Sequence, residues 1–247
     1  SVMRTLDFDA RGNALDQISE TSVYDAAIGR LVLTSSNEIK NRDYSNNGDA
    51  ARQTITSYQV EYEKDENGDF VVGADGMYVY LEDVLVNHQV MANRVYDSQH
   101  NILNQNILTY SDVEQTDLLE VQEIRSSGYT TTGVARQQII LSFSDAAKTE
   151  LLDAQLVENV EIKASGDVTK SIITRYGDIS EGLNTSGAIL ASNLSSEIDR
   201  QTITTNEFDV MGNALDQTII REYWGREKDE NGNDKGEEMF LFAETQR

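Results

Sequence analysis

Two acidic turns carry the residue types and spacing that best fit metal binding. Their candidate ligands are Asp65, Asn67 and Asp69 in DENGD, and Asp229, Asn231 and Asn233 in DENGND. In each turn, side-chain oxygens alternate around a glycine, as in the first third of a calcium-binding loop, but the glutamate that completes an EF-hand is missing. Asn-Gly pairs are equally typical of hairpin turns. The sequence therefore predicts two turns, with calcium as the ion that would bind if one does.

Catalytic chemistry finds little support in the remaining residues. The chain has two histidines, His88 and His100, and no cysteine, so no Ser-His-Asp or Cys-His arrangement can be assembled. With 43 acidic residues, two carboxylates at glycosidase separation would arise by chance. We expect no catalytic residue, no enzyme activity and no required cofactor. His100 is predicted to be an exposed turn residue.

Composition narrows the possible partners. The net charge is −23, which repels phosphate backbones and anionic lipids, so nucleic acid is not an expected partner. The sequence has no apolar run long enough to span a membrane and no apolar export signal, so we expect no membrane insertion. Proline is absent, so a long stack of strands would meet no built-in break. Because the chain starts without Met, we expect a segment of a longer protein.

The same short unit recurs along the chain. Residues 8–17 read FDARGNALDQ and residues 208–217 read FDVMGNALDQ, with weaker copies at 96–105 (YDSQHNILNQ) and 44–53 (YSNNGDAARQ). A second type of unit starts at Tyr110 (YSDVEQTDLLEVQEI) and Phe143 (FSDAAKTELLDAQLV). Repetition of this kind indicates copies of one supersecondary unit.

The pattern within the units favours strands. In TITSYQVEY the residues alternate between two faces with a period of two, which is a sheet pattern. TELLDAQ contains helix formers, but its flanks are β-branched and aromatic, so a strand is predicted there too. We expect an all-β fold of antiparallel hairpins that form an extended or spiralling sheet. It would be a single repeat array over 1–247, with an irregular stretch at about 180–198 and acidic hairpin insertions at about 63–80 and 225–240.

Local geometry explains why the same residues recur. The Asp after the aromatic residue is predicted to accept hydrogen bonds from turn amides, while Gly or Asn permits the left-handed conformation. The aromatic residues are predicted to pack on one another from unit to unit. The closing glutamines are predicted to form stacked amide ladders. They are Gln17, Gln53, Gln105, Gln122, Gln138, Gln155 and Gln217.

The aromatic-Asp pair and the turn that follows it resemble a known repeat. FDARGN at Phe8, FDVMGN at Phe208, YDSQHN at Tyr96 and YDAAIGRL at Tyr24 resemble the YD repeat, also called the RHS repeat, of large bacterial surface and toxin-shell proteins. The resemblance implies antiparallel hairpins that join edge to edge into a spiralling sheet. In the toxin relatives, this sheet closes into a hollow shell.

A longer repeat is superimposed on the short one. The stretch from Gln53, QTITSYQVEYEKDENGDF, returns from Gln217 as QTIIREYWGREKDENGND. MFLFAETQR from Met239, continued into SVMRTLDFD, would resemble the stretch from Met77, so the two ends of the chain would join in phase. This predicts a tandem array or copies stacked end to end. Duplication inside one finite domain remains the alternative.

These observations lead to one expected function and two alternatives. We expect a non-enzymatic extracellular structural protein of the bacterial cell surface, a repeat segment that self-associates end to end into a homo-oligomer or filament. The first alternative is the wall of a toxin-encapsulating shell. The second is a carbohydrate-binding adhesin, in which Trp224 and Tyr223 would form the platform for surface glycans.

Overall fold

The computed structural model describes residues 1–179, 190–210 and 212–247 of the chain. Within these residues the chain forms thirteen β-strands and one short 3-10 helix, η1 (Ala191–Asn193). The strands are β1 (Val2–Phe8), β2 (Ala14–Asp25), β3 (Arg30–Tyr44), β4 (Ala50–Tyr62), β5 (Tyr80–Tyr96), β6 (Ile102–Tyr110), β7 (Leu118–Ser127), β8 (Gln137–Phe143), β9 (Leu151–Ile162), β10 (Val168–Ile179), β11 (Leu194–Phe208), β12 (Ala214–Lys228) and β13 (Asp234–Gln246).

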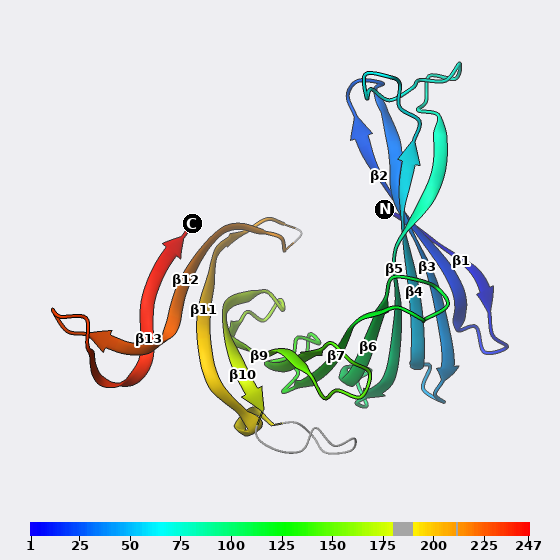
Figure 1. Cartoon of the computed structure of the whole chain (residues 1–247). Helices are drawn as coiled ribbons and strands as arrows, with labels where there is room; N and C mark the ends of the chain where they lie inside the picture. The colour runs from blue at the N-terminus through cyan, green and yellow to red at the C-terminus, as the bar shows by residue number, and fades with distance from the viewer. Residues whose placement is uncertain (180–189, 211) are drawn as a thin grey trace. The chain divides into compact units, whose positions relative to one another are not determined.

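Each strand lies beside its neighbours in the chain (Figure 1). The order in the sheet runs from β1 to β13 without a crossover, and β1 and β13 are its edge strands. Adjacent strands pair antiparallel, as in the hairpin of β2 and β3 and that of β11 and β12. The predicted all-β fold of antiparallel hairpins is confirmed, and the sheet is open.

The chain divides into two compact units, and the prediction of a single repeat array stays a prediction. The first contains Ser1–Arg94 and Asn106–Val121, and the second contains Val95–Gln105 and Gln122–Arg247. In the first unit, buried apolar side chains include Val60 and Val90, and in the second they include Leu141 and Phe143, which are fully buried. Alternation along β8 places Leu141 and Phe143 on the same face of the strand.

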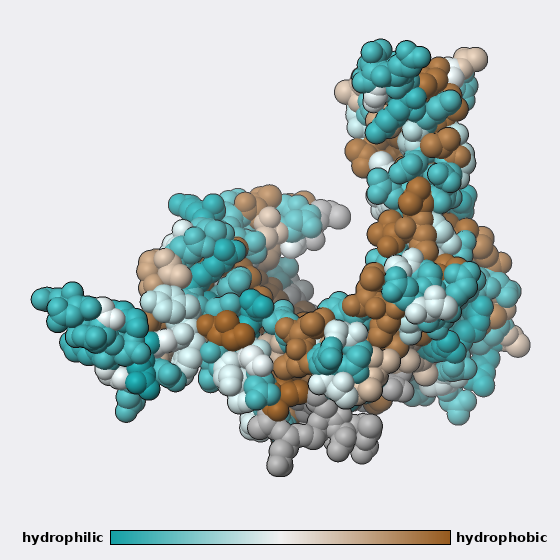
Figure 2. Space-filling model, in the orientation of Figure 1, coloured by the Kyte–Doolittle hydropathy of each residue, from teal (hydrophilic) through white to brown (hydrophobic). Residues whose placement is uncertain are grey.

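Apolar side chains also reach the surface of both units (Figure 2). Leu31 and Leu81 in the first unit and Leu215 and Phe242 in the second are each more than half exposed. A sheet with few covering elements leaves such residues in solvent. Within the described residues, no helix is long and apolar enough to cross a membrane.

The first type of turn has the predicted Asp cap. In residues 9–13, the Asp9 carboxylate accepts hydrogen bonds from the backbone amides of Arg11 (2.8 Å) and Asn13 (2.9 Å), and Asn13 Nδ2 donates to it at 2.8 Å. Gly12 has a φ of +86°, the left-handed conformation that favours glycine. His100 takes the glycine position of its own turn with a φ of 66° and is exposed, as predicted.

The second type of turn is also built on an aspartate. Asp145 Oδ2 accepts hydrogen bonds from the amides of Thr149 (2.9 Å) and Glu150 (2.8 Å), and β9 follows directly. Lys148 holds the left-handed position with a φ of 58°. Asp112 repeats this arrangement with Thr116 before β7. Because β7 and β9 contain the Leu-Leu segments, the strand prediction for them is confirmed.

The glutamines were predicted to stack on one another, but in the structure they pair with other residue types. Four of them bond to the Thr, Asn or Ser that stands directly across the hairpin, whereas Gln155 bonds to Asp153 on its own strand. The pairs are Gln17 with Thr5 (3.2 Å), Gln53 with Asn41 (2.7 Å), Gln138 with Ser126 (3.0 Å) and Gln217 with Thr205 (3.0 Å). The constant turn length fixes the hairpin register, so each rung joins a glutamine to whatever residue lies opposite.

The repeated tyrosines are held by their hydroxyl groups, a contact that the predicted stacking did not include. The Tyr44 hydroxyl donates to the carbonyl oxygen of Ala14 at 2.6 Å, and the Tyr129 hydroxyl donates to that of Ile102. Ala14 and Ile102 are the first residues of β2 and β6. A tyrosine after one hairpin therefore fixes the start of an earlier strand.

The irregular segments differ in structure. Of the stretch predicted at about 180–198, residues 180–189 lie outside the described residues, and β11 already begins at Leu194. Residues 63–79 leave the main ladder between β4 and β5. The second acidic segment, predicted as a hairpin at about 225–240, comprises the end of β12, the start of β13 and the tight turn that joins them.

Candidate functional site

The first acidic segment folds into two small hairpins. The amide of Asp65 donates to the carbonyl of Asp69 (2.9 Å), and that of Gly73 donates to that of Met77 (2.8 Å). The backbones of Glu63, Val71 and Val79 then pair side by side, because Val71 donates to Glu63 and Val79 donates to Val71, both at 2.9 Å. Residues 63–79 therefore form a miniature sheet at the end of β4.

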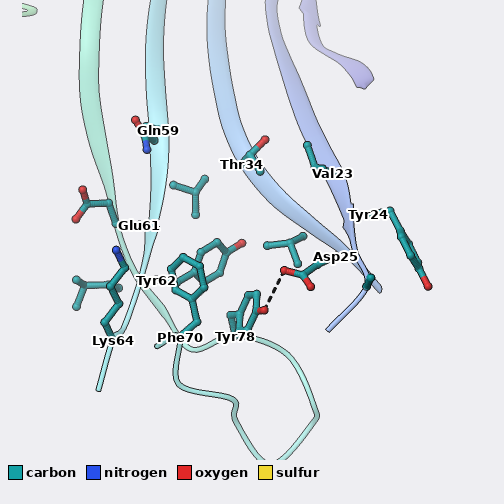
Figure 3. A pocket seen from close by; sticks show the side chains of 14 residues that line it. Val23, Tyr24, Asp25, Thr34, Gln59, Glu61, Tyr62, Lys64, Phe70 and Tyr78 are labelled. Atoms are coloured by element: carbon teal, nitrogen blue, oxygen red, sulfur yellow. Dashed lines mark hydrogen bonds between the residues drawn. The ribbon is translucent and has the colours of Figure 1, made fainter. Parts of the chain in front are cut away.

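This miniature sheet brings three aromatic rings together. Tyr62 lies 6.3 Å from Phe70 and 5.8 Å from Tyr78 between ring centroids, and Phe70 lies 4.9 Å from Tyr78. Figure 3 shows the three rings grouped below the strands, with Tyr24 turned away from them. Aromatic contacts of this kind contribute roughly 0.5–1.5 kcal/mol each beyond the area they bury.

Long-range hydrogen bonds anchor the cluster to earlier strands. The Tyr62 hydroxyl donates to the carbonyl oxygen of Leu33 in β3 at 2.8 Å. The Tyr78 hydroxyl donates to Asp25 Oδ2 at the end of β2 at 2.9 Å (Figure 3). The Tyr78 bond holds the miniature sheet against β2, and the Tyr62 bond holds the end of β4 against β3.

A pocket of about 710 Å³ lies beside this aromatic cluster, within the first unit. Its walls are Tyr62, Phe70 and Tyr78 together with aliphatic side chains from β2 to β5. The aliphatic wall residues are Val23, Val32, Val60 and Leu81. The volume is in the range of small-molecule sites, roughly 300–1,000 Å³. The pocket is therefore the candidate functional site.

Charged groups stand among these walls. Asp25 and Glu61 are the carboxylates of the lining, and Lys64 is its cation, with Nζ 5.2 Å from the centroid of the Phe70 ring. The amide of Ala27 and the Tyr78 hydroxyl donate to Asp25 and lower its pKa, while the same carboxylate raises the pKa of Tyr78. Asp25 is therefore ionised and Tyr78 protonated at neutral pH.

These groups can bind a ligand, but they do not form a nucleophile and base pair. The lining residues include no histidine, cysteine or serine, and the Asp25 carboxylate is already engaged with Tyr78. Apolar and aromatic surface makes up most of the walls. The arrangement supports recognition of a ligand.

The sequence did not identify this pocket, although it contained one signal. Tyr62, Phe70 and Tyr78 recur at a constant interval, and each interval encloses one glycine turn. Such spacing places the three rings on corresponding positions of successive hairpins. Asp25 could not be found this way, because its contact with Tyr78 joins distant parts of the chain.

The six residues predicted as calcium ligands lie in two separate turns. Asp65 Oδ1 accepts hydrogen bonds from the amides of Asn67 (2.8 Å) and Asp69 (3.0 Å). Asp229 Oδ1 likewise accepts from the amides of Asn231 (2.8 Å) and Asn233 (2.9 Å). In each turn, the first carboxylate thus acts as the cap of the turn. The calcium sites stay a prediction.

The two histidines have different environments. His88 is buried in β5, where its Nδ1 lies 2.9 Å from Thr56 Oγ1, and its Nε2 has no hydrogen-bond partner among the described residues. Burial, and then the positive charge of Lys40, lower the pKa of His88, while Asp112 opposes them. His88 is therefore a neutral core residue at physiological pH.

Trp224 and Tyr223 do not form the single platform suggested by the sequence. They are adjacent in β12, so their side chains point to opposite faces of the sheet. Trp224 packs edge-on against Phe240 with ring centroids 4.8 Å apart, and Arg200 Cζ lies 4.1 Å from the centroid of Phe240. Tyr223 is 49% exposed on the other face.

Comparison with known proteins adds no assignment. No protein-family model matches the chain, and no curated protein matches it. The resemblance to YD repeats therefore rests on the motifs themselves.

Proposed function

We propose that this chain is a non-enzymatic structural segment of an extracellular bacterial repeat protein, and that it self-associates by adding strands at both edges of its sheet. The observation that carries the proposal is a pair of complementary gaps in the two edge ladders. Support for the extracellular setting comes from the YD-like motifs.

The first gap lies beside β2. β1 pairs with β2 from Phe8 opposite Ala14 to Val2 opposite Glu20. β2 continues to Asp25, and β3 pairs with it along that length. Among the described strands, residues 21–25 of β2 therefore have a ladder partner on one side only.

The second gap lies beside β12. β13 pairs with β12 from Asp234 opposite Lys228 to Gln246 opposite Ile219. Residues 214–218 of β12 pair with β11 on one side and with none of the described strands on the other. The Arg247 side chain reaches back over this part of β12 to Asp216 at 3.1 Å.

The two gaps fit one another in a second copy of the chain. In a continuing antiparallel sheet, β13 of one copy and β1 of the next run in the same direction, between β12 and the next β2. β1 would then cover residues 214–218 of the first copy, and β13 would cover residues 21–25 of the next. The resemblance of the joined ends to the stretch from Met77, within which β5 lies, supports this arrangement.

The edges have the chemistry of strand addition. Edge strands present unpaired N–H and C=O groups that can pair with another chain, and proline, which blocks such pairing, is absent. Met3 on β1 is 59% exposed, and Phe242 on β13 is 65% exposed. Stacking of a second copy would cover both side chains and satisfy the backbone groups.

Sedimentation velocity over a concentration series tests this proposal. We expect the wild-type chain to form larger species as its concentration rises. Met3→Glu and Phe242→Glu should each weaken the association, because each places a charge at an edge. Val210→Glu is the matched control, since Val210 is fully exposed in a turn and lies on neither edge strand. A single monomeric species at every concentration would refute the proposal.

A further inference from the structure

The segment that lines the pocket in the first unit has a counterpart in the second unit, and the two segments differ in their side chains. The stretches from Gln53 and Gln217 share the same turn sequence and the same pairing with the preceding strand. Gln59 pairs with Ser35 in the first copy, and the equivalent Tyr223 pairs with Asp199 in the second. Because the registers match, positions along β4 and β12 can be compared directly.

The position of Val60 in the pocket is taken by Trp224 in the second copy. There the indole packs against Phe240, the residue directly opposite it in β13, and the Arg200 guanidinium lies over the Phe240 ring. In the second copy, the same face of the strand therefore holds an aromatic ring next to a cation. In the first copy, the smaller Val60 leaves about 710 Å³ open beside Tyr62 and Tyr78.

We propose that this pocket binds a planar aromatic ring carried by a positively charged molecule. The aromatic and aliphatic walls fit the ring, which would take the place that the indole holds in the second copy. Asp25 and Glu61 outnumber the single cation Lys64 in the lining, and the chain as a whole carries a charge of −23, so a cation is attracted and an anion repelled.

The geometry of the rings disfavours a sugar in this place. The plane of the Tyr62 ring lies at 82° to that of Phe70 and at 60° to that of Tyr78, and the planes of Phe70 and Tyr78 are tilted by 42° to each other. Stacking of a sugar ring calls for an open, flat aromatic face. The three rings instead form an angular corner that can receive the edge of an aromatic ring. Val23, Tyr24 and Asp25 line the pocket and also lie in the gap beside β2, so ligand titrations are made at a chain concentration at which sedimentation shows a monomer, which keeps this test separate from strand addition.

Calorimetric titration with tryptamine, an indole on an ammonium side chain, tests the proposal. We expect saturable binding to the wild-type chain with a dissociation constant of about 0.1–1 mM, as is usual for so small a ligand. Val60→Trp should weaken binding at least about tenfold, because a loss of 1.4 kcal/mol of contact suffices for that factor. Val86→Trp is the matched control, since Val86 is exposed on β5 and does not line the pocket.

The role of charge is tested separately. Indole-3-propionate, an anion of similar size, should bind at least about threefold more weakly than tryptamine, and this difference should shrink as salt is added. Asp25→Asn should weaken tryptamine binding. The amide oxygen of the asparagine can still accept the hydrogen bond that the Tyr78 hydroxyl donates to Asp25. This variant also tests the site if Val60→Trp does not fold, which circular dichroism would show.

Three results would overturn the inference. The first is the absence of saturable tryptamine binding up to about 10 mM, a range that covers the weakest affinity expected of so small a ligand. The second is tryptamine binding that neither Val60→Trp nor Asp25→Asn weakens. The third is equal affinity for the anionic and cationic indoles.

Discussion

Two copies of one segment, residues 53–81 and 217–243, share a backbone plan and differ in what their side chains enclose. Both contain a long strand followed by a DENG turn. In the first copy, the chain then makes a second small hairpin and leaves a pocket beside Val60. In the second copy, β13 follows directly and Trp224 packs on Phe240. The repeat therefore sets the ladder, and a few side chains decide whether a site stays open.

The copies also differ in polarity on the same strand face. Thr56 in β4 lies within hydrogen-bonding distance of the buried His88. The equivalent position in β12 is Ile220. A titratable core group is thus found in the first copy at a place where the second has an aliphatic side chain.

The largest expected effect comes from exchanging the residues that distinguish the two copies. Trp224→Val removes the indole from Phe240 and should lower the free energy of unfolding of the second unit by about 2–3 kcal/mol, since Trp224 is half-buried. Urea denaturation followed by circular dichroism measures this, because Trp224 is the only tryptophan and its fluorescence is lost.

The reciprocal change, Val60→Trp, is the control for that experiment. It fills space that is already open, so we expect a smaller effect on unfolding than Trp224→Val has, with either sign. Equal losses of stability in the two variants would show that Trp224 and Val60 are not equivalent positions.

The next effect is a pH dependence confined to the first copy. Because the pKa of His88 is lowered in the folded chain, its neutral form stabilises the fold. This contribution is fully present above the unfolded pKa of about 6.5 and is lost as the pH falls from there through the lowered folded value. The denaturation midpoint of the first unit should therefore decrease as the pH is lowered from about 7.5 to about 5.

Substitution of the two histidines separates this effect from general charge changes. His88→Gln should flatten the profile, because the side chain no longer titrates. His100→Gln is the matched control, since His100 lies in an exposed turn. A profile that responds equally to both substitutions would contradict the assignment to His88.

A smaller effect concerns the final residue of each DENG turn. In the second copy, Asn233 Nδ2 adds a bond to Asp229 at 3.2 Å, and the bonds from Asn233 and Asn231 lower the pKa of Asp229. In the first copy, the equivalent residue is Asp69, a carboxylate near Asp65. Asp69→Asn should raise the thermal midpoint slightly and Asn233→Asp should lower it. Shifts of the opposite sign would show that the additional amide bond does not stabilise the turn.

The smallest expected effect is that of calcium on the same two turns. If Asp65 and Asp229 help to bind the ion, the thermal midpoint should rise with millimolar calcium and fall back with a chelator. Asp65→Asn and Asp229→Asn should remove that response one turn at a time. An unchanged midpoint in the wild-type chain would remove the calcium hypothesis.

The sequence was sufficient to predict the local structure of these segments. Alternation along residues 54–62 and the Asn67-Gly68 pair predict a strand and a hairpin turn, and the structure contains both. The left-handed position of the first type of turn was also visible, even where His100 replaces glycine, whereas nothing in the sequence marked Gln115 and Lys148, which hold that position before β7 and β9. Local backbone preferences determine such features, so a single sequence reveals them.

Long-range contacts were not visible in the same way. The glutamine rungs depend on which residue the register places opposite, as Asn41 lies opposite Gln53. The pocket depends on Asp25 meeting Tyr78, two residues from different hairpins. The contrast of Tyr223 with Trp224 could have been predicted from strand alternation alone, because adjacent residues face opposite sides.

Cross-linking between copies tests the proposed strand addition most directly, and the chain has no cysteine of its own to interfere. Met3→Cys protein, with its thiol on β1, is mixed with Leu215→Cys protein, whose thiol lies in the gap beside β12; both side chains are exposed. We predict a mixed disulfide dimer in clear excess over the mixture of Met3→Cys with Val210→Cys. Equal yields from the two mixtures would contradict strand addition between β1 and β12.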